Sequence, residues 1–191
     1  HGRLYSTQAL SKHAIECFKD ARDIQEEYVQ LKHICYWDMA LAYMSLNEWR
    51  KTSFCFTVLA NENNWSKALY HYARAASLYE TGNATEREEA KEVMERVPSM
   101  TQRIAGKSIP LEKFAARKAR KMTQYGYLFH PAMEFAYLTH CYTSSSPSSL
   151  YQRSLPVIEK ELARMETEAN PVQDDLCLAH FLHGVILRNL A

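Results

Sequence analysis

The sequence predicts an all-α fold built from antiparallel helix pairs, and three observations support that prediction. Only five glycines and six prolines interrupt the 191 residues, and these residue types are the strongest breakers of helices. Apolar side chains recur with the helical period along the chain. One such stripe, at i, i+3, i+4 and i+7, is Ala90, Val93, Met94 and Val97. No segment alternates apolar and polar residues as a half-buried strand would.

Five helical blocks are predicted in the first half of the chain. Their bounds are about 6–27, 31–46, 48–61, 65–81 and 85–97. Turn-forming residues set the ends of the blocks, because Asn, Gly and Pro favour backbone conformations that a helix cannot continue. Asn47 ends the second block, and the run Asn61–Asn64 ends the third. Gly82 ends the fourth and Pro98 the fifth.

The pattern of predicted helices and turns differs in the second half of the chain. Gly106 marks a helix end and loop over 102–110, which leads into a basic helix of about 111–125. Gly126 and Pro131 mark the next turn. The remaining predicted helices are about 131–142, 149–168 and 172–190, with a serine-rich loop over 144–149 and a break at Asn170–Pro171.

A repeat with an offset of 36 residues is visible in the first half. Tyr36, Met39, Ala40 and Tyr43 recur as Tyr72, Ala75, Ala76 and Tyr79. The offset is close to the roughly 34-residue tetratricopeptide period, in which two antiparallel helices form one unit. The small residues Ala40 and Ala76 let paired helices approach closely. We therefore predict a short right-handed solenoid of tetratricopeptide-like helical hairpins, with a generic helical bundle as the alternative.

The predicted repeats place the whole chain in one helical-repeat domain over 1–191. Degenerate repeats cover about 31–61 and 65–97, and a basic loop and helix is inserted at about 102–125. Further helices fill about 131–190. Because the chain begins His1-Gly2 without an initiator Met, we expect it to be a fragment of a longer protein.

Four longer segments are more specific than the repeat pattern. They are His33–Asp38, Glu62–Ala68, Gln102–Pro110 and Glu112–Ala119. In these segments the chain resembles the tetratricopeptide repeat protein 39 family, also called Iml2-like, over essentially its whole length and in the family's C-terminal region. The resemblance implies a non-enzymatic helical-repeat adaptor with loose associations to lipid handling and protein turnover. It supplies no catalytic residues.

Composition narrows the expected partners and compartment. With 23 basic and 22 acidic side chains the net charge is +1, so a nucleic-acid partner, which usually requires a basic excess, is not expected. No apolar run reaches the about 20 residues that span a bilayer. The five cysteines are widely spaced and lack a CxxC pair, which indicates a reducing compartment. We expect a cytoplasmic protein, either free or peripheral to an organelle surface.

The candidate partner-binding groove follows from the repeat. Tetratricopeptide arrays bind peptides on the concave surface made by the first helix of each pair. The equivalent positions here are Ile34, Trp37, Leu41 and Met44, then Tyr70, Ala73, Ser77 and Glu80. Trp37 and Leu41 stand where a carboxylate clamp places Lys and Asn, so recognition of chaperone C-terminal peptides is not expected. The apolar groove fits either a hydrophobic partner segment or another part of the same protein.

A cationic face is predicted on the basic helix. Lys113, Arg117, Arg120 and Lys121 fall at i, i+4, i+7 and i+8, which places them on one side of a helix. This is a candidate anion-binding face for an acidic partner, lipid headgroups or RNA. The alternatives are a solvated face, or one that pairs with the acidic helix 85–97.

Neither a catalytic site nor a metal site is predicted. The chain has no Gly-rich phosphate loop, nucleophile elbow or HExxH motif. Cys177, His180 and His183 are each three residues apart, so successive side chains differ by about 60° around the helix and the outer two by about 120°. This is too far for the three to bind one metal ion together. We therefore expect no cofactor and predict a non-enzymatic scaffold that binds a protein or peptide. The alternative function is a module that binds an anionic lipid surface or a hydrophobic segment.

Overall fold

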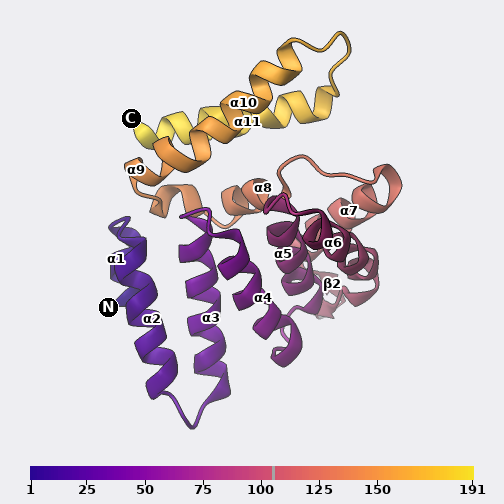
Figure 1. Cartoon of the computed structure of the whole chain (residues 1–191). Helices are drawn as coiled ribbons and strands as arrows, with labels where there is room; N and C mark the ends of the chain where they lie inside the picture. The colour runs from indigo at the N-terminus through magenta and orange to yellow at the C-terminus, as the bar shows by residue number, and fades with distance from the viewer. Residues whose placement is uncertain (105) are drawn as a thin grey trace.

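The computed structural model of the chain describes residues 1–104 and 106–191, and it confirms the all-α helical-repeat fold (Figure 1). Residue 105, within the predicted loop 102–110, lies outside the described residues. The first half contains α1 (Gly2–Thr7), α2 (Ser11–Ile24), α3 (Val29–Met44), α4 (Trp49–Glu62), α5 (Lys67–Glu80) and α6 (Ala84–Arg96). The second half contains η1 (Val97–Met100), β1 (Arg103–Ile104), β2 (Lys107–Ser108), α7 (Pro110–Tyr125), α8 (Pro131–Leu138), η2 (Cys141–Ser144), α9 (Pro147–Ser149), η3 (Leu150–Ser154), α10 (Leu155–Glu166) and α11 (Gln173–Leu190).

Helices α2 to α6 stand side by side and alternate in direction, each packed against the next along the chain. The small residues that predicted close helix contacts lie in the interior of this packing. Ala40 on α3 and Ala76 on α5 are fully buried, and Phe56 on α4 fills the space between the two helices. A residue with only a Cβ lets two helix backbones approach closely, so the 36-residue offset in the sequence is a packing repeat in the structure.

Backbone conformation explains where the helix bounds differ from the prediction. The predicted first helix, 6–27, is two helices, because Ala9 has a φ of 57° and interrupts it between α1 and α2. A left-handed conformation is uncommon for Ala, so no residue type marked this break. At Asn47 (φ 54°) and Gly126 (φ 76°) the same conformation falls on residues that favour it, and there the turns were predicted.

Local structure in the second half is less regular than predicted. The loop around Gly106 is closed by a β-hairpin of two-residue strands, in which Arg103 pairs with Ser108 and Ile104 with Lys107. The predicted helix 131–142 ends at Leu138 as α8. The predicted helix 149–168 starts as one π-helical turn, η3, before α10.

The segment after α8 returns to the start of the chain and binds the turn between α3 and α4. The carbonyl oxygen of Ser45 accepts hydrogen bonds from the hydroxyls of Ser145 (3.2 Å) and Ser149 (3.1 Å). Arg153 donates to the carbonyl oxygen of Leu46 at 2.6 Å. Helices α10 and α11 then form an antiparallel hairpin across this end of the bundle, drawn in orange and yellow in Figure 1.

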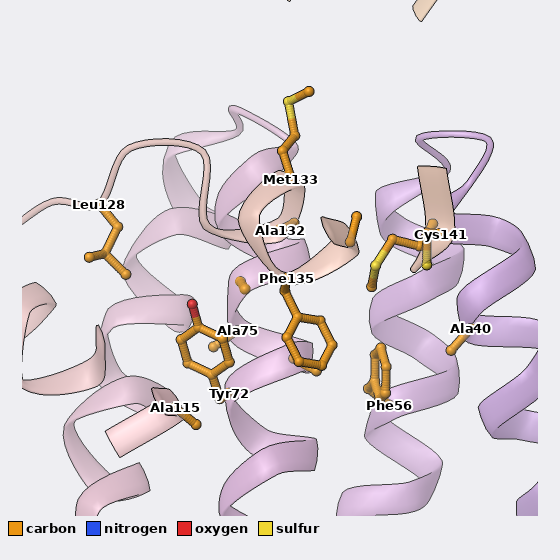
Figure 2. Packing of buried hydrophobic residues seen from close by; sticks show 14 of the residues in the cluster. Ala40, Phe56, Tyr72, Ala75, Ala115, Leu128, Ala132, Met133, Phe135 and Cys141 are labelled. Atoms are coloured by element: carbon orange, nitrogen blue, oxygen red, sulfur yellow. The ribbon is translucent and has the colours of Figure 1, made fainter. Parts of the chain in front are cut away.

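Helix α8 lies against α5 and α3 and joins the core through Phe135. This ring is fully buried, with ring centroids 6.1 Å from Phe56 and 6.0 Å from Tyr72, both edge to face. Figure 2 shows Phe135 pointing from α8 into the space between these two rings. A third edge-to-face contact, at 5.6 Å, links Tyr72 to Phe114 on α7. One aromatic cluster therefore connects α4, α5, α7 and α8.

Candidate partner-binding face

The predicted groove corresponds to the side of α3 and α5 on which α8 packs, which we call the inner face. The part of this face near the α3–α4 turn is already occupied by the chain itself. Met44 is only 1% exposed, and its sulfur lies 3.9 Å from the hydroxyl of Thr139, directly after α8. Met44 was predicted to contact a partner, and in the structure it contacts the end of α8 instead.

The four groove positions predicted on α5 are not available to a partner either. Tyr70, Ala73 and Ser77 are all buried, and the Ser77 hydroxyl donates to the carbonyl oxygen of Ala73 at 2.8 Å. Helix α5 is the central helix of the fold, in contact with α4, α6, α7 and α8. Because neighbours surround this helix, Tyr70, Ala73 and Ser77 do not line an open groove, contrary to the prediction.

Glu80, the fourth of these positions, holds α8 in place. One carboxylate oxygen accepts a hydrogen bond from the backbone N–H of Ala132 at 3.2 Å, in the first turn of α8, and the other contacts Nδ1 of His130. Burial lowers the pKa of His130, but the charge and hydrogen bond of Glu80 outweigh it and the net effect raises that pKa. Glu80 thus holds His130, whose backbone is left-handed with φ 34°, through a part-buried ion pair.

Away from α8 the inner face stays open, at the end of α3 nearest its N-terminus. Ile34 is 45% exposed, and Leu31, one turn earlier on the same side, is 46% exposed. Trp37 is half-buried, and its ring lies 6.1 Å from that of Tyr70, centroid to centroid. The ring of Trp65, in the turn before α5, also lies 6.4 Å from that of Tyr70, and Trp65 is 54% exposed. We call Leu31, Ile34, Trp37 and Trp65 the open strip.

Leu41 lies between the open strip and α8 and lines a cavity of about 240 Å³. The other walls of this cavity come from α1, α2 and η2, and its polar groups bond to one another. Nε of Arg3 is 2.7 Å from Asp38, and the hydroxyls of Ser11 and Ser45 are 2.7 Å apart. Leu41 is therefore half-buried against the chain's own N-terminal helices.

The sequence pattern identified two of the four residues in the open strip, Ile34 and Trp37, and missed Leu31 and Trp65. Leu31 was assigned only to the start of a helix. Trp65 lies in a turn, where its backbone N–H bonds to the side-chain oxygen of Asn63 at 2.8 Å. Helical periodicity carries no information about the direction of a side chain in a turn. Only the contact between Trp65 and Tyr70 in the structure shows that Trp65 belongs to the open strip.

The predicted cationic face is present on α7, but only three of its four members are free. Lys113, Arg117 and Arg120 are exposed and form no ion pair with any described residue. The Lys121 Nζ is 3.6 Å from Asp174 and 3.8 Å from Asp175, both on α11.

The acidic helix α6 does not neutralise the basic helix, as one of the predicted alternatives required. Within the described chain, Glu86 binds Arg50, Glu89 binds Arg74 and Glu88 binds Lys91. The partners of α7 are instead on α8 and α11. Helix α6 is in contact with α7, but no ion pair joins the two helices within the described residues.

Cys177, His180 and His183, which were not expected to bind one metal ion together, all lie on α11. Cys177 and His180 are exposed, and His183 Nε2 is 3.8 Å from Glu159 on α10. Across residues 1–104 and 106–191, no group of three or more His, Cys, Asp or Glu side chains is arranged to hold a metal ion. All five cysteines are free thiols.

No helix in the described chain combines the length and apolarity that a membrane span needs.

Comparison with known proteins agrees with the fold. The family model described as Iml2/Tetratricopeptide repeat protein 39 matches residues 1–190. The tetratricopeptide repeat protein ttc-39B of Caenorhabditis elegans is 31% identical over 183 residues, which cover 93% of this chain and 31% of that protein. The chain thus spans about a third of the length of this relative. No solved structure matches it. The family match over nearly every residue, on a fold of paired helices, shows that the chain belongs to the Iml2/tetratricopeptide repeat protein 39 family.

Proposed function

We propose that the chain is a non-enzymatic scaffold that binds an apolar segment of a protein partner on the open strip. The observation that carries the proposal is the exposure of large apolar side chains beside an aromatic floor. Leu31, Ile34 and Trp65 are each about half exposed, and the buried ring of Tyr70 contacts both Trp65 and the half-buried Trp37. Contiguous exposed apolar surface on a soluble domain typically marks an interaction site.

The chain itself supplies an example of how this face binds a helix. Helix α8 buries one aromatic anchor, Phe135, in the adjacent part of the inner face, and Glu80 fixes the first turn of α8. A partner segment on the open strip would continue the same apolar surface toward the N-terminus of α3. Aromatic residues dominate the binding energy at most interfaces, so Trp37 and Trp65 are the expected anchor sites for the partner.

Site-specific photo-cross-linking tests this proposal. The photoreactive amino acid p-benzoylphenylalanine replaces Ile34 in the 191-residue chain, and in a matched control it replaces Leu187, which is equally exposed on α11. Proteins cross-linked in lysate are identified by mass spectrometry, and each candidate is then purified. Its affinity is measured for the wild type, for Ile34→Asp and for Leu187→Asp.

The proposal requires a protein that cross-links from Ile34 but not from Leu187. Its purified form should bind the Ile34→Asp variant at least about tenfold more weakly, a loss of about 1.4 kcal/mol, while Leu187→Asp binds like the wild type. Cross-links that are the same at both positions, or an affinity that Ile34→Asp leaves unchanged, would show that the open strip is not the binding site.

A further inference from the structure

Positive charge is concentrated in one part of this nearly neutral chain. Residues 101–125 contain seven of the 23 basic side chains and one of the 22 acidic ones, which gives this segment a charge of +6 and the rest of the chain −5. The single acidic residue, Glu112, does not offset the exposed cations. It is fully buried, and its carboxylate accepts from the Ser66 hydroxyl (2.5 Å) and the Gln102 backbone N–H (2.7 Å).

Ion pairs inside the molecule use two of the seven cations. Lys118 lies 2.6 Å from Glu134, and Lys121 faces Asp174 and Asp175. These two cations help to fix α7 against α8 and α11. The α7 face, which we define as Lys113, Arg117 and Arg120, has no such role, because all three are exposed and none is ion-paired within the described residues.

The α7 face has a regular geometry. Its three residues lie at i, i+4 and i+7, so their Cα atoms follow one side of the helix with steps of about 6 and 4.5 Å along the axis. The hairpin that precedes α7 adds two more exposed cations, Arg103 and Lys107. These two are not opposite each other in the strand pairing, so they point to opposite faces of the hairpin and raise the local potential without extending the α7 face.

We propose that the α7 face binds an acidic segment of a protein partner, at a site separate from the open strip. In an extended peptide, side chains on one side recur every about 6.7 Å, which is close to the about 6 Å step from Lys113 to Arg117. The shorter step to Arg120, about 4.5 Å, is within reach of the long Arg side chain. Arg117 and Arg120 can each bind a carboxylate with two parallel hydrogen bonds. The negative charge of the rest of the chain disfavours anionic partners elsewhere on the surface and so directs such a segment to α7.

Two other anions fit this surface less well. Single-stranded RNA binds largely through bases stacked on aromatic side chains, and Tyr125 is the one large exposed apolar side chain on the described part of α7. Stable attachment to an anionic membrane combines basic residues with inserted apolar ones, and among the described residues of α7 only the same side chain, Tyr125, is large, apolar and exposed. RNA and membrane are therefore alternative outcomes of the test.

The test uses labelled poly-glutamate of about 20 residues as the probe, with fluorescence anisotropy at about 50 mM and about 200 mM salt. The test variant reverses the α7 face (Lys113→Glu, Arg117→Glu and Arg120→Glu). The matched control reverses three exposed, unpaired cations elsewhere (Lys12→Glu, Lys160→Glu and Arg188→Glu). Both variants change the net charge equally, and a thermal melt of each establishes that it is folded.

We expect the α7 variant to bind poly-glutamate at least about tenfold more weakly than the wild type, and the control to lose about twofold or less. Wild-type binding should also weaken at the higher salt, because exposed charges are screened over about 8–10 Å. An equal loss in both variants, or no binding by the wild type, would overturn the proposal. So would tighter α7-dependent binding of a 20-nucleotide poly-uridine RNA or of phosphatidylserine vesicles, because the ligand class would then be wrong.

Discussion

Replacing Phe135 by Ala should destabilise the fold by about 3–5 kcal/mol. The side chain is fully buried, so its removal forfeits the about 2–3 kcal/mol gained by taking a Phe side chain out of water. The rings of Phe56 and Tyr72 on either side come from separate helices and can only partly collapse into the space, which adds a cavity term of about 1–2 kcal/mol. For a chain of this length the melting temperature should fall by about 6–20 °C.

Urea unfolding followed by circular dichroism measures this loss, with Phe181→Ala as the matched control. Phe181 on α11 also makes an edge-to-face contact, at 4.7 Å with Tyr137 of α8, but it is 44% exposed. Its removal should cost about 1 kcal/mol or less. If the two substitutions cost the same, or if Phe135→Ala costs less than about 1.5 kcal/mol, α8 is not part of the core and the description of the inner face is wrong.

Three further outcomes follow from buried polar groups and thiols. The pKa of His130 is raised by Glu80, so this pair stabilises the fold fully below the unfolded pKa of about 6.5 and less as the pH rises through the folded-state pKa. The stability advantage of the wild type over Glu80→Gln should therefore shrink as the pH rises above about 6.5 in urea unfolding. Glu112→Ala should cost about 2–4 kcal/mol in the same assay, because the buried Ser66 hydroxyl and the part-buried Gln102 N–H both lose their acceptor. Iodoacetamide at about pH 8 should alkylate exposed Cys177 within minutes, whereas Cys141, whose pKa burial raises to about 12, should react only in urea; equal rates by mass spectrometry would contradict its burial.

Much of the fold could be predicted from the sequence because repeat packing is local. The recurrence of Ala40 as Ala76 marks the close helix contacts, and Gly or Asn at the turns marks helix ends. The break at Ala9 was missed because its left-handed conformation is uncommon for Ala. Contacts between distant segments, such as those of Phe135 with Phe56, depend on the tertiary arrangement and leave no periodic signal in the chain.

The same difference between local patterns and contacts of distant segments explains which site residues could be predicted. The position of the three free cations on α7 follows from spacing along one helix, so Lys113, Arg117 and Arg120 could be identified in advance. Which cation is paired depends on helices distant in sequence, so the spacing could not show that Lys121 faces Asp174 on α11. For the inner face, the sequence indicated apolar residues on one side of α3. It could not indicate that α8 would cover Met44 while leaving Ile34 exposed.

The central claim is that α8 fills part of the inner face as a permanent member of the core, so that partners have access only to the open strip. Native-state amide hydrogen exchange, resolved by residue, tests this claim most directly. The amides of α8 from Glu134 to Leu138 should be protected nearly as well as those of α5, because both helices open only with the core. Rapid exchange in α8 while α5 remains protected would contradict the claim, because it would show that α8 detaches and leaves the whole inner face open.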